Sequence, residues 1–144
     1  MKIAFSSIAC RNLAVLFVIL SVLTSCEKDK KPEPDLATRV SGTYRYSELT
    51  YDGNTIPGEQ TNLKGNIVVS VQTASKVKMK LDIRLKTNSA EFMVLEASDV
   101  ELVQSESTVD LFYESERIGR ITGNKMVING VDEDDVNFTI SAVK

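Results

Sequence analysis

The chain has 144 residues, enough for one domain of ordinary size. It contains 17 Lys and Arg residues against 20 Asp and Glu residues, so it lacks the basic surplus expected of a nucleic-acid-binding protein. It contains no histidine, which excludes Ser–His and Cys–His nucleophile pairs and removes a common zinc ligand.

The first predicted element is the apolar run LAVLFVILSVL over residues 13–23, which follows the basic residues Lys2 and Arg11. A positive start, a short apolar run and small residues after it are the layout of a secretory signal peptide. A helix over the uncharged residues 12–26 would reach about 22 Å, whereas the hydrocarbon core of a bilayer is about 30 Å thick. The pattern therefore predicts a cleaved signal peptide over residues 1–25 rather than a membrane-spanning helix.

The apolar run ends in Leu23-Thr24-Ser25-Cys26, which resembles the lipobox of bacterial lipoproteins. In that family the cysteine receives a diacylglycerol group and the peptide bond before it is cut. The resemblance implies that Cys26 carries acyl chains such as palmitate, and two or three chains anchor a protein firmly because each buried methylene contributes about 0.8 kcal/mol. The alternative is an ordinary buried or disulfide-bonded cysteine. However, Cys10 is the only other cysteine, and it lies in the predicted signal peptide.

A charged segment, EKDKKPEPDL, follows over residues 27–36 and contains two of the three prolines. It predicts an extended tether over residues 26–37. Its composition also resembles the segment that some Gram-negative bacteria use to send lipoproteins to the cell surface, with a plain spacer as the equal alternative. The lipoprotein resemblance implies an outer membrane location, with the protein facing either the periplasm or the medium. Removal of residues 1–25 takes away two basic residues and no acid, so the net charge falls from −3 to −5.

Residues 38–144 have the pattern of one all-β domain. The clearest strand is KVKMKLDIRLK over residues 76–86, in which apolar and charged residues alternate without a break, as in a strand with one buried face. The other predicted strands cover residues 42–51, 66–72, 91–104 (one long strand or two), 108–114, 117–122, 125–130 and 135–144. No helix is predicted after the signal peptide. About eight strands joined by short turns predict an antiparallel up-and-down meander that closes into a barrel, and a β-sandwich is the alternative.

Three stretches resemble small lipocalin-like, calycin-type domains, which also occur on bacterial lipoproteins: VSGTYRYSELTYDG (residues 40–53), IGRITGNKMVING (118–130) and FTISAVK (138–144). The resemblance implies a barrel with an apolar interior and transfers no site residue. The expected interior residues are Ile67, Val69, Val71, Val77, Met79, Leu81, Ile83, Leu85, Val109, Leu111, Phe138 and Ile140. An eight-stranded barrel is just wide enough to be filled by such side chains or to hold one small ligand. The candidate ligand-binding residues are Val69, Met79, Leu81 and Phe138.

Two charge patterns are candidate binding sites. The basic face of residues 76–86 could bind an anion or a polysaccharide. However, a hairpin at residues 87–89 would place the acidic segment after it alongside, so structural ion pairing is the favoured interpretation. The acidic stretch VDEDDV (131–136) could hold Ca²⁺, but it lacks the ligand spacing of an EF-hand and predicts a charged hairpin turn.

Two classes of function are consistent with the sequence. One is binding of a small apolar molecule inside the barrel, and the other is a non-enzymatic interaction or inhibitor module with a filled core. With no histidine, and with Cys26 acylated, the Ser–His and Cys–His systems and most zinc sites are removed. A carboxylate pair could still hydrolyse glycosides, but most acids alternate onto the wet face, where we expect their pKa values to stay ordinary. We therefore expect no enzymatic activity, no cofactor, no metal, no nucleic-acid partner and a monomer. The aromatic girdles and the outward apolar band of a membrane-spanning barrel are missing from the pattern.

Overall fold

The structure, a computed structural model, describes residues 33–132 and 134–144. The predicted signal peptide, Cys26 and most of the predicted tether lie outside the described residues. Within the described ranges, no helix has the length and hydrophobicity that a membrane-crossing helix needs.

The described residues form one short helix and nine strands. They are α2 (Leu36–Val40), β1 (Gly42–Tyr51), β2 (Asn54–Pro57), β3 (Leu63–Thr73), β4 (Lys76–Leu85), β5 (Glu91–Ser105), β6 (Thr108–Tyr113), β7 (Glu116–Thr122), β8 (Lys125–Val131) and β9 (Asn137–Val143). Every predicted strand is present, and residues 91–104 belong to one long strand. The short strand β2 was not predicted, because its sequence reads as part of a turn-rich connection.

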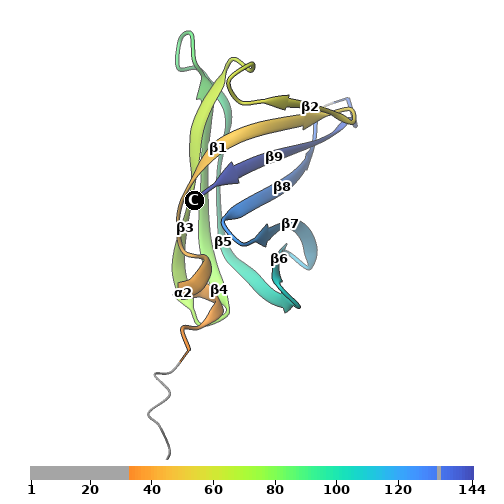
Figure 1. Ribbon diagram of the computed structural model, residues 1–144. Coiled ribbons are helices and arrows are strands. Elements are labelled where there is room, and N and C mark those ends of the chain that lie inside the picture. The colour runs from red at the N-terminus through yellow and green to blue at the C-terminus, as the bar shows by residue number, and fades with distance from the viewer. Residues whose placement is uncertain (1–32, 133) are drawn as a thin grey trace, which may run out of the picture. The chain divides into compact units, whose positions relative to one another are not determined.

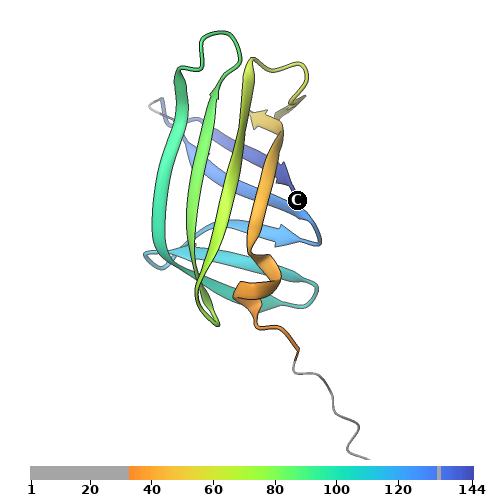
Figure 2. The ribbon, with the colours of Figure 1, turned by 90° about the vertical axis from the view of Figure 1, so that its left-hand side faces the viewer.

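Eight of these strands close into an antiparallel barrel in the order β1, β3, β4, β5, β6, β7, β8 and β9, and β9 pairs back with β1. This closure confirms the predicted all-β barrel and decides against the sandwich. β1, β3, β4 and β5 form one wall, and β6–β9 cross behind it (Figures 1 and 2). β2 pairs only with residues 48–51 of β1 and lies outside the ring of eight strands.

The alternation along β4 sorts its side chains as predicted. Val77, Met79, Leu81 and Ile83 are buried in the single hydrophobic core. Lys78 and its charged neighbours on β4 face outward. Each fully buried aliphatic side chain contributes roughly 1.5–3 kcal/mol relative to an exposed one, so this core is the main source of stability.

The predicted charge pairing between β4 and β5 is confirmed. Lys76 pairs with Glu101 at 3.3 Å and Arg84 with Glu91 at 3.5 Å, and Lys78 also contacts the carboxylate of Glu96. These side chains are well exposed, so each pair contributes at most about 1 kcal/mol. Their main effect is to fix the register of the hairpin, because opposite charges lie on neighbouring strands.

The helix α2 corrects the prediction that no helix follows the signal peptide. The Asp35 carboxylate accepts a hydrogen bond from the backbone N–H of Thr38 at 2.8 Å and caps the first turn. Ala37 and Val40 are the buried residues of the helix. A helix of five residues with only two buried side chains is too short to give a recognisable periodicity in the sequence.

Candidate functional site

One end of the barrel, here called the helix-capped end, is closed by α2. The backbone N–H of Ala37 donates to the carbonyl of Ala74 in the β3–β4 turn at 3.2 Å, and the Tyr44 hydroxyl donates to the carbonyl of Val40 at 2.7 Å. The tyrosine is buried, and this burial raises the pKa of its hydroxyl. Most inward-facing side chains near this end are buried. Val71 is an exception, since it lies on β3 beyond the residues that pair with β1.

The opposite end, here called the open end, is formed by loops. The connections at residues 58–62 and 86–90 meet there, where the backbone N–H of Lys86 donates to the carbonyl of Asn62 at 2.8 Å. The β8–β9 connection also lies there, because the Tyr51 hydroxyl at the end of β1 donates to Asp132 Oδ2 at 2.6 Å.

The wall of the barrel is incomplete beside the first half of β5. β5 pairs with β4 from Glu91 to Glu101, but it pairs with β6 only through Glu101–Ser105. The first half of β5 is therefore an edge, and Figure 2 shows it at the margin of its wall. Side chains that point inward from this edge are not covered by a neighbouring strand on that side.

Leu95 is the clearest consequence of this edge. It pairs directly with Leu81 across the β4–β5 ladder, so both side chains lie on the same, inward face of the sheet. Leu81 is 5% exposed, whereas Leu95 is 58% exposed. Met93, which pairs with the buried Ile83, faces inward as well and is half-buried.

A second set of inward-facing residues at the open end is partly exposed. Phe138 on β9 pairs with Tyr51 and with Gly130, and its ring lies so close that a Cβ atom at position 130 would be 2.3 Å from Phe138 Cζ. Phe138 is half-buried, and Tyr51 is exposed. We call Met93, Leu95, Tyr51 and Phe138 the open-end residues.

The four predicted interior candidates all face the core but do not form one site. Val69, Met79 and Leu81 are at most 5% exposed and are enclosed by other core residues, so a ligand could reach them only by displacing the core. Phe138 alone lies among the open-end residues. Cys26, the predicted lipid attachment site, lies outside the described residues.

The open-end residues of β5 were missed because the alternation of this segment is interrupted. β5 contains extra residues relative to β4 at Phe92 and at Ser98–Asp99, and Asp99 has a positive φ of 59°. Each bulge reverses the face on which the following side chains lie. The missing neighbour beside β5 depends on the closed fold and has no signal in the segment itself.

The acidic stretch at residues 131–136, of which Glu133 lies outside the described residues, connects the paired strands β8 and β9, as expected of the predicted hairpin turn. Asp132 Oδ1 accepts hydrogen bonds from the backbone N–H groups of Asp134 and Val136 at 2.9 and 2.8 Å. The pKa of the Asp132 carboxyl is lowered, chiefly by the hydrogen bond from the Tyr51 hydroxyl. Among the residues that the structure describes, no three carboxylates or thiols are grouped as metal ligands.

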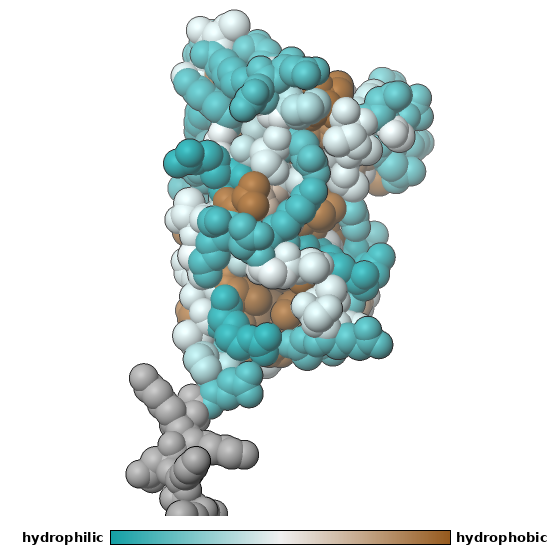
Figure 3. All heavy atoms as spheres, in the orientation of Figure 1, coloured by the Kyte–Doolittle hydropathy of each residue, from teal (hydrophilic) through white to brown (hydrophobic). Residues whose placement is uncertain are grey.

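The outer surface of the barrel is more hydrophilic than its interior. On the face seen in Figure 3, hydrophobic residues appear only in small areas between hydrophilic ones. The outward side chains of β4 are Lys76, Lys78, Lys80, Asp82 and Arg84. On β4, this arrangement is the reverse of the outward apolar band of a membrane-spanning barrel.

No protein-family model matches the chain, and no curated protein matches it in sequence. Among solved structures, the chain is similar to a proposed outer membrane protein from Bacteroides fragilis, with 13% identity and a TM-score of 0.49 over 77% of this chain and 53% of that one. The chain thus spans about half the length of that protein. It is also similar to a redesigned β-barrel, with 16% identity and a TM-score of 0.47 over 75% of this chain and 93% of that one.

Proposed function

We propose that this protein is a lipid-anchored lipoprotein of the cell envelope, without enzymatic activity, whose lipocalin-like barrel binds a small apolar molecule at its open end. The observation that carries the proposal is the contrast between Leu81 and Leu95. An inward-facing leucine that stays 58% exposed leaves apolar surface in contact with water. Covering such surface contributes about 25 cal/mol per Å², so an apolar ligand gains free energy there.

The difference between the two ends supports this location for the ligand. α2 and the buried hydroxyl of Tyr44 close the helix-capped end, where Val69 and Met79 already fill the interior. The open end has no such helix among the described residues, and Phe138 and Tyr51 remain partly accessible there. A ligand at the open end would extend the existing core rather than replace part of it.

The proposal of a lipid anchor rests on the sequence that precedes the barrel. The lipobox-like sequence Leu23–Cys26 would supply the site of lipid attachment. The charged, proline-containing tether would then connect the lipid to the barrel. The barrel would lie near an outer membrane, on either its periplasmic or its outer face. The charged outward face of β4 supports a barrel carried by an anchor rather than inserted in the bilayer. Cys26→Ala should move the protein from the membrane fraction to the soluble fraction. Unchanged membrane fractionation of this variant would contradict the lipoprotein proposal.

A second function, an interaction or inhibitor module with a filled core, is favoured by the burial of Val69, Met79 and Leu81. The two functions differ in their response to apolar compounds. A fatty acid or an apolar fluorescent probe should raise the melting temperature of the chain without its signal (residues 26–144), since a ligand at 100 times its Kd adds about 2.7 kcal/mol. If a broad panel of apolar compounds leaves the melting temperature unchanged, the interaction module becomes the better account.

The depth of the site is tested by Val69→Phe. Val69 lies in the filled part of the barrel, so a larger side chain should overpack the core and destabilise the fold by about 1–3 kcal/mol. Probe affinity measured well below the melting temperature should not change, because the open-end residues are untouched. Loss of probe binding in a folded Val69→Phe protein would place the ligand deeper in the barrel than proposed.

A further inference from the structure

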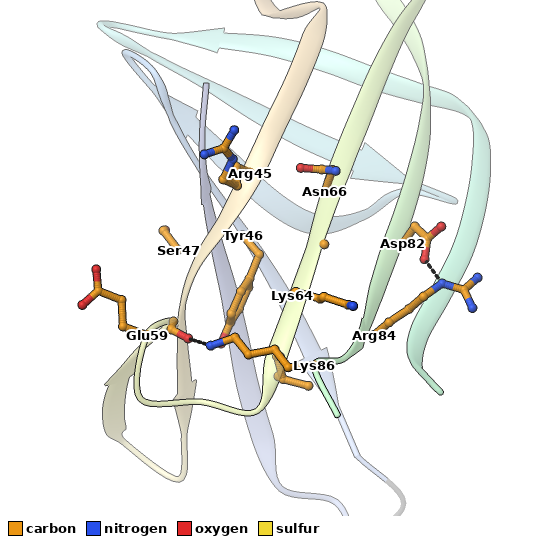
Figure 4. Close-up of a pocket in the computed structure, with 12 residues that line it drawn as sticks. Arg45, Tyr46, Ser47, Glu59, Lys64, Asn66, Asp82, Arg84 and Lys86 are labelled. Atoms are coloured by element: carbon orange, nitrogen blue, oxygen red, sulfur yellow. Dashed lines mark hydrogen bonds and ion pairs between the residues drawn. The ribbon is translucent and has the colours of Figure 1, made fainter. Parts of the chain in front are cut away.

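We propose that the barrel carries a second, separate ligand site, a cleft on its outer wall that binds a small polar ligand through a carboxylate, sulfate or phosphate group. We call it the basic cleft. The side chains that matter for binding are Arg45, Ser47, Lys64, Asn66, Arg84 and Lys86 (Figure 4). The cleft borders the open end, because loop 58–62 and Lys86 belong to both, but its lining includes none of the open-end residues Met93, Leu95, Tyr51 and Phe138.

The cleft exists because β1 leaves β3. The two strands pair only through Gly42–Arg45 and Asn66–Val69, and beyond Arg45 the strand β1 turns to pair with β2. The space between the diverging strands is a cleft of about 730 Å³. A second hollow of about 520 Å³ shares Arg45, Ser47 and Asn66 with it. Volumes of this size suit a small organic ligand rather than only a free ion.

The wall of the cleft opposite β4 is a loop, residues 58–62, that is held in place from several sides. The backbone N–H of Gly58 donates to the carbonyl of Ser47 at 2.6 Å. The Lys86 ammonium donates to the carbonyls of Gly58 and Thr61, both at 2.8 Å. The hydroxyls of Tyr46 and Thr61 are hydrogen-bonded at 3.1 Å. A wall held this way reduces the ordering cost of binding.

The charges in the cleft are unbalanced. Four basic residues but only two acids line it, and one of these acids, Asp82, is bound by Arg84 at 2.6 Å. The other acid, Glu59, points away from Lys64 and Arg84 (Figure 4).

Three cations in the cleft have no acidic partner. The recorded hydrogen-bond acceptors of Lys86 are neutral carbonyls, and that of Lys64 is the Ser89 hydroxyl at 3.2 Å. Within the described part of the chain, no carboxylate lies within 4.0 Å of the charged nitrogens of Arg45, Lys64 or Lys86. An anion that enters the cleft would therefore meet positive charge that the protein has not neutralised.

The lysines at the start of β4, which belong to the same basic surface, differ from the cations of the cleft because they form ion pairs. Lys76 and Lys78 on β4 are paired with acids of β5, as expected from the sequence. Lys76 and Lys78 are thus neutralised by acids, whereas Arg45, Lys64 and Lys86 in the basic cleft are not, in a chain whose net charge is −3. Arginine and lysine donors beside the Ser47 hydroxyl and the Asn66 amide match the several acceptor oxygens of an oxyanion.

The test is an amide chemical-shift titration of residues 26–144 at low salt with phosphate, sulfate, glucuronate and glucose. We expect an oxyanion to shift the amides of Ser47, Lys64 and Asn66, and glucose to leave them unchanged. The relative response to the two inorganic anions and to glucuronate identifies which carrier the cleft prefers. The double variant Arg45→Gln/Lys64→Gln should weaken binding about 10-fold or more, because both cations are lost. The matched control, Arg117→Gln on β7, should bind as the wild type does.

Retained shifts of core amides such as that of Val100 will establish that the double variant is folded, since both substituted side chains are exposed. The proposal is overturned if no anion shifts the cleft amides, if the double variant binds with wild-type affinity, or if Arg117→Gln weakens binding equally. The last result would mean diffuse attraction to basic residues. None of these results depends on apolar binding at the open end.

Discussion

The helix-capped end and the open end of the barrel are built from the same strands, yet they differ in how far their inward-facing apolar side chains are buried. Near α2, the inward residues Val69 and Met79 are almost completely buried, and the helix adds Ala37 and Val40 to the core. On the open side, Leu95 faces the same interior and remains largely exposed. An eight-stranded barrel can therefore be filled over part of its length and still leave apolar interior surface for a ligand.

The largest expected effect compares the two leucines directly. Leu81→Ala removes a buried side chain and should lower the free energy of unfolding by about 2–5 kcal/mol. Leu95→Ala, on the paired residue of the next strand, should cost less than about 1 kcal/mol because its side chain is mostly in water. Urea unfolding of both variants measures the difference. Equal losses would mean that Leu95 is covered in solution and that no apolar interior surface is exposed beside the first half of β5.

A smaller effect compares two tyrosines, one at each end. Tyr44→Phe leaves the buried carbonyl of Val40 without its hydrogen bond and should cost about 1–3 kcal/mol. Tyr51→Phe removes an exposed hydrogen bond to Asp132, so a much smaller change is expected. Amide exchange of residues 36–40 should accelerate only in the Tyr44 variant. Unaltered exchange there would argue against the closing role of this hydroxyl.

The smallest effect is a pH dependence at both ends. The pKa of Asp35 is lowered, first by the backbone N–H of Thr38, and that of Asp132 is lowered, first by the Tyr51 hydroxyl. Because both folded pKa values lie below the usual unfolded value of about 3.9, their stabilisation is present above that pH and is lost as the pH falls through the folded values. A carbon-detected NMR titration should give both low values. Tyr51→Phe should raise the pKa of Asp132 and leave that of Asp35 unchanged, and a shift of both would show that the ends are coupled.

The barrel could be predicted from the sequence because most strands can be recognised from the residue pattern of their own segment. Residues 76–86 alternate without a break, and the acids after them identify the partner strand. The open end could not be predicted in the same way. Its position depends on the bulges at Phe92 and Ser98–Asp99 and on where β6 stops pairing with β5. The basic cleft likewise depends on the point at which β1 leaves β3, and α2 is too short for a periodic signal.

The ligand site at the open end is tested most directly by two substitutions at equally exposed residues. Leu95 and Val131 are both 58% exposed, but Leu95 faces the interior, whereas Val131 on β8 alternates with the inward-facing Ile128 and Gly130 and faces outward. Leu95→Gln and Val131→Gln should each change stability by less than about 1 kcal/mol. In a fluorescence titration with an apolar probe, we predict that Leu95→Gln weakens binding several-fold and that Val131→Gln leaves it unchanged. Equal probe affinity in the two variants, or probe binding that only Val131→Gln weakens, would contradict a ligand site at the open end of the barrel.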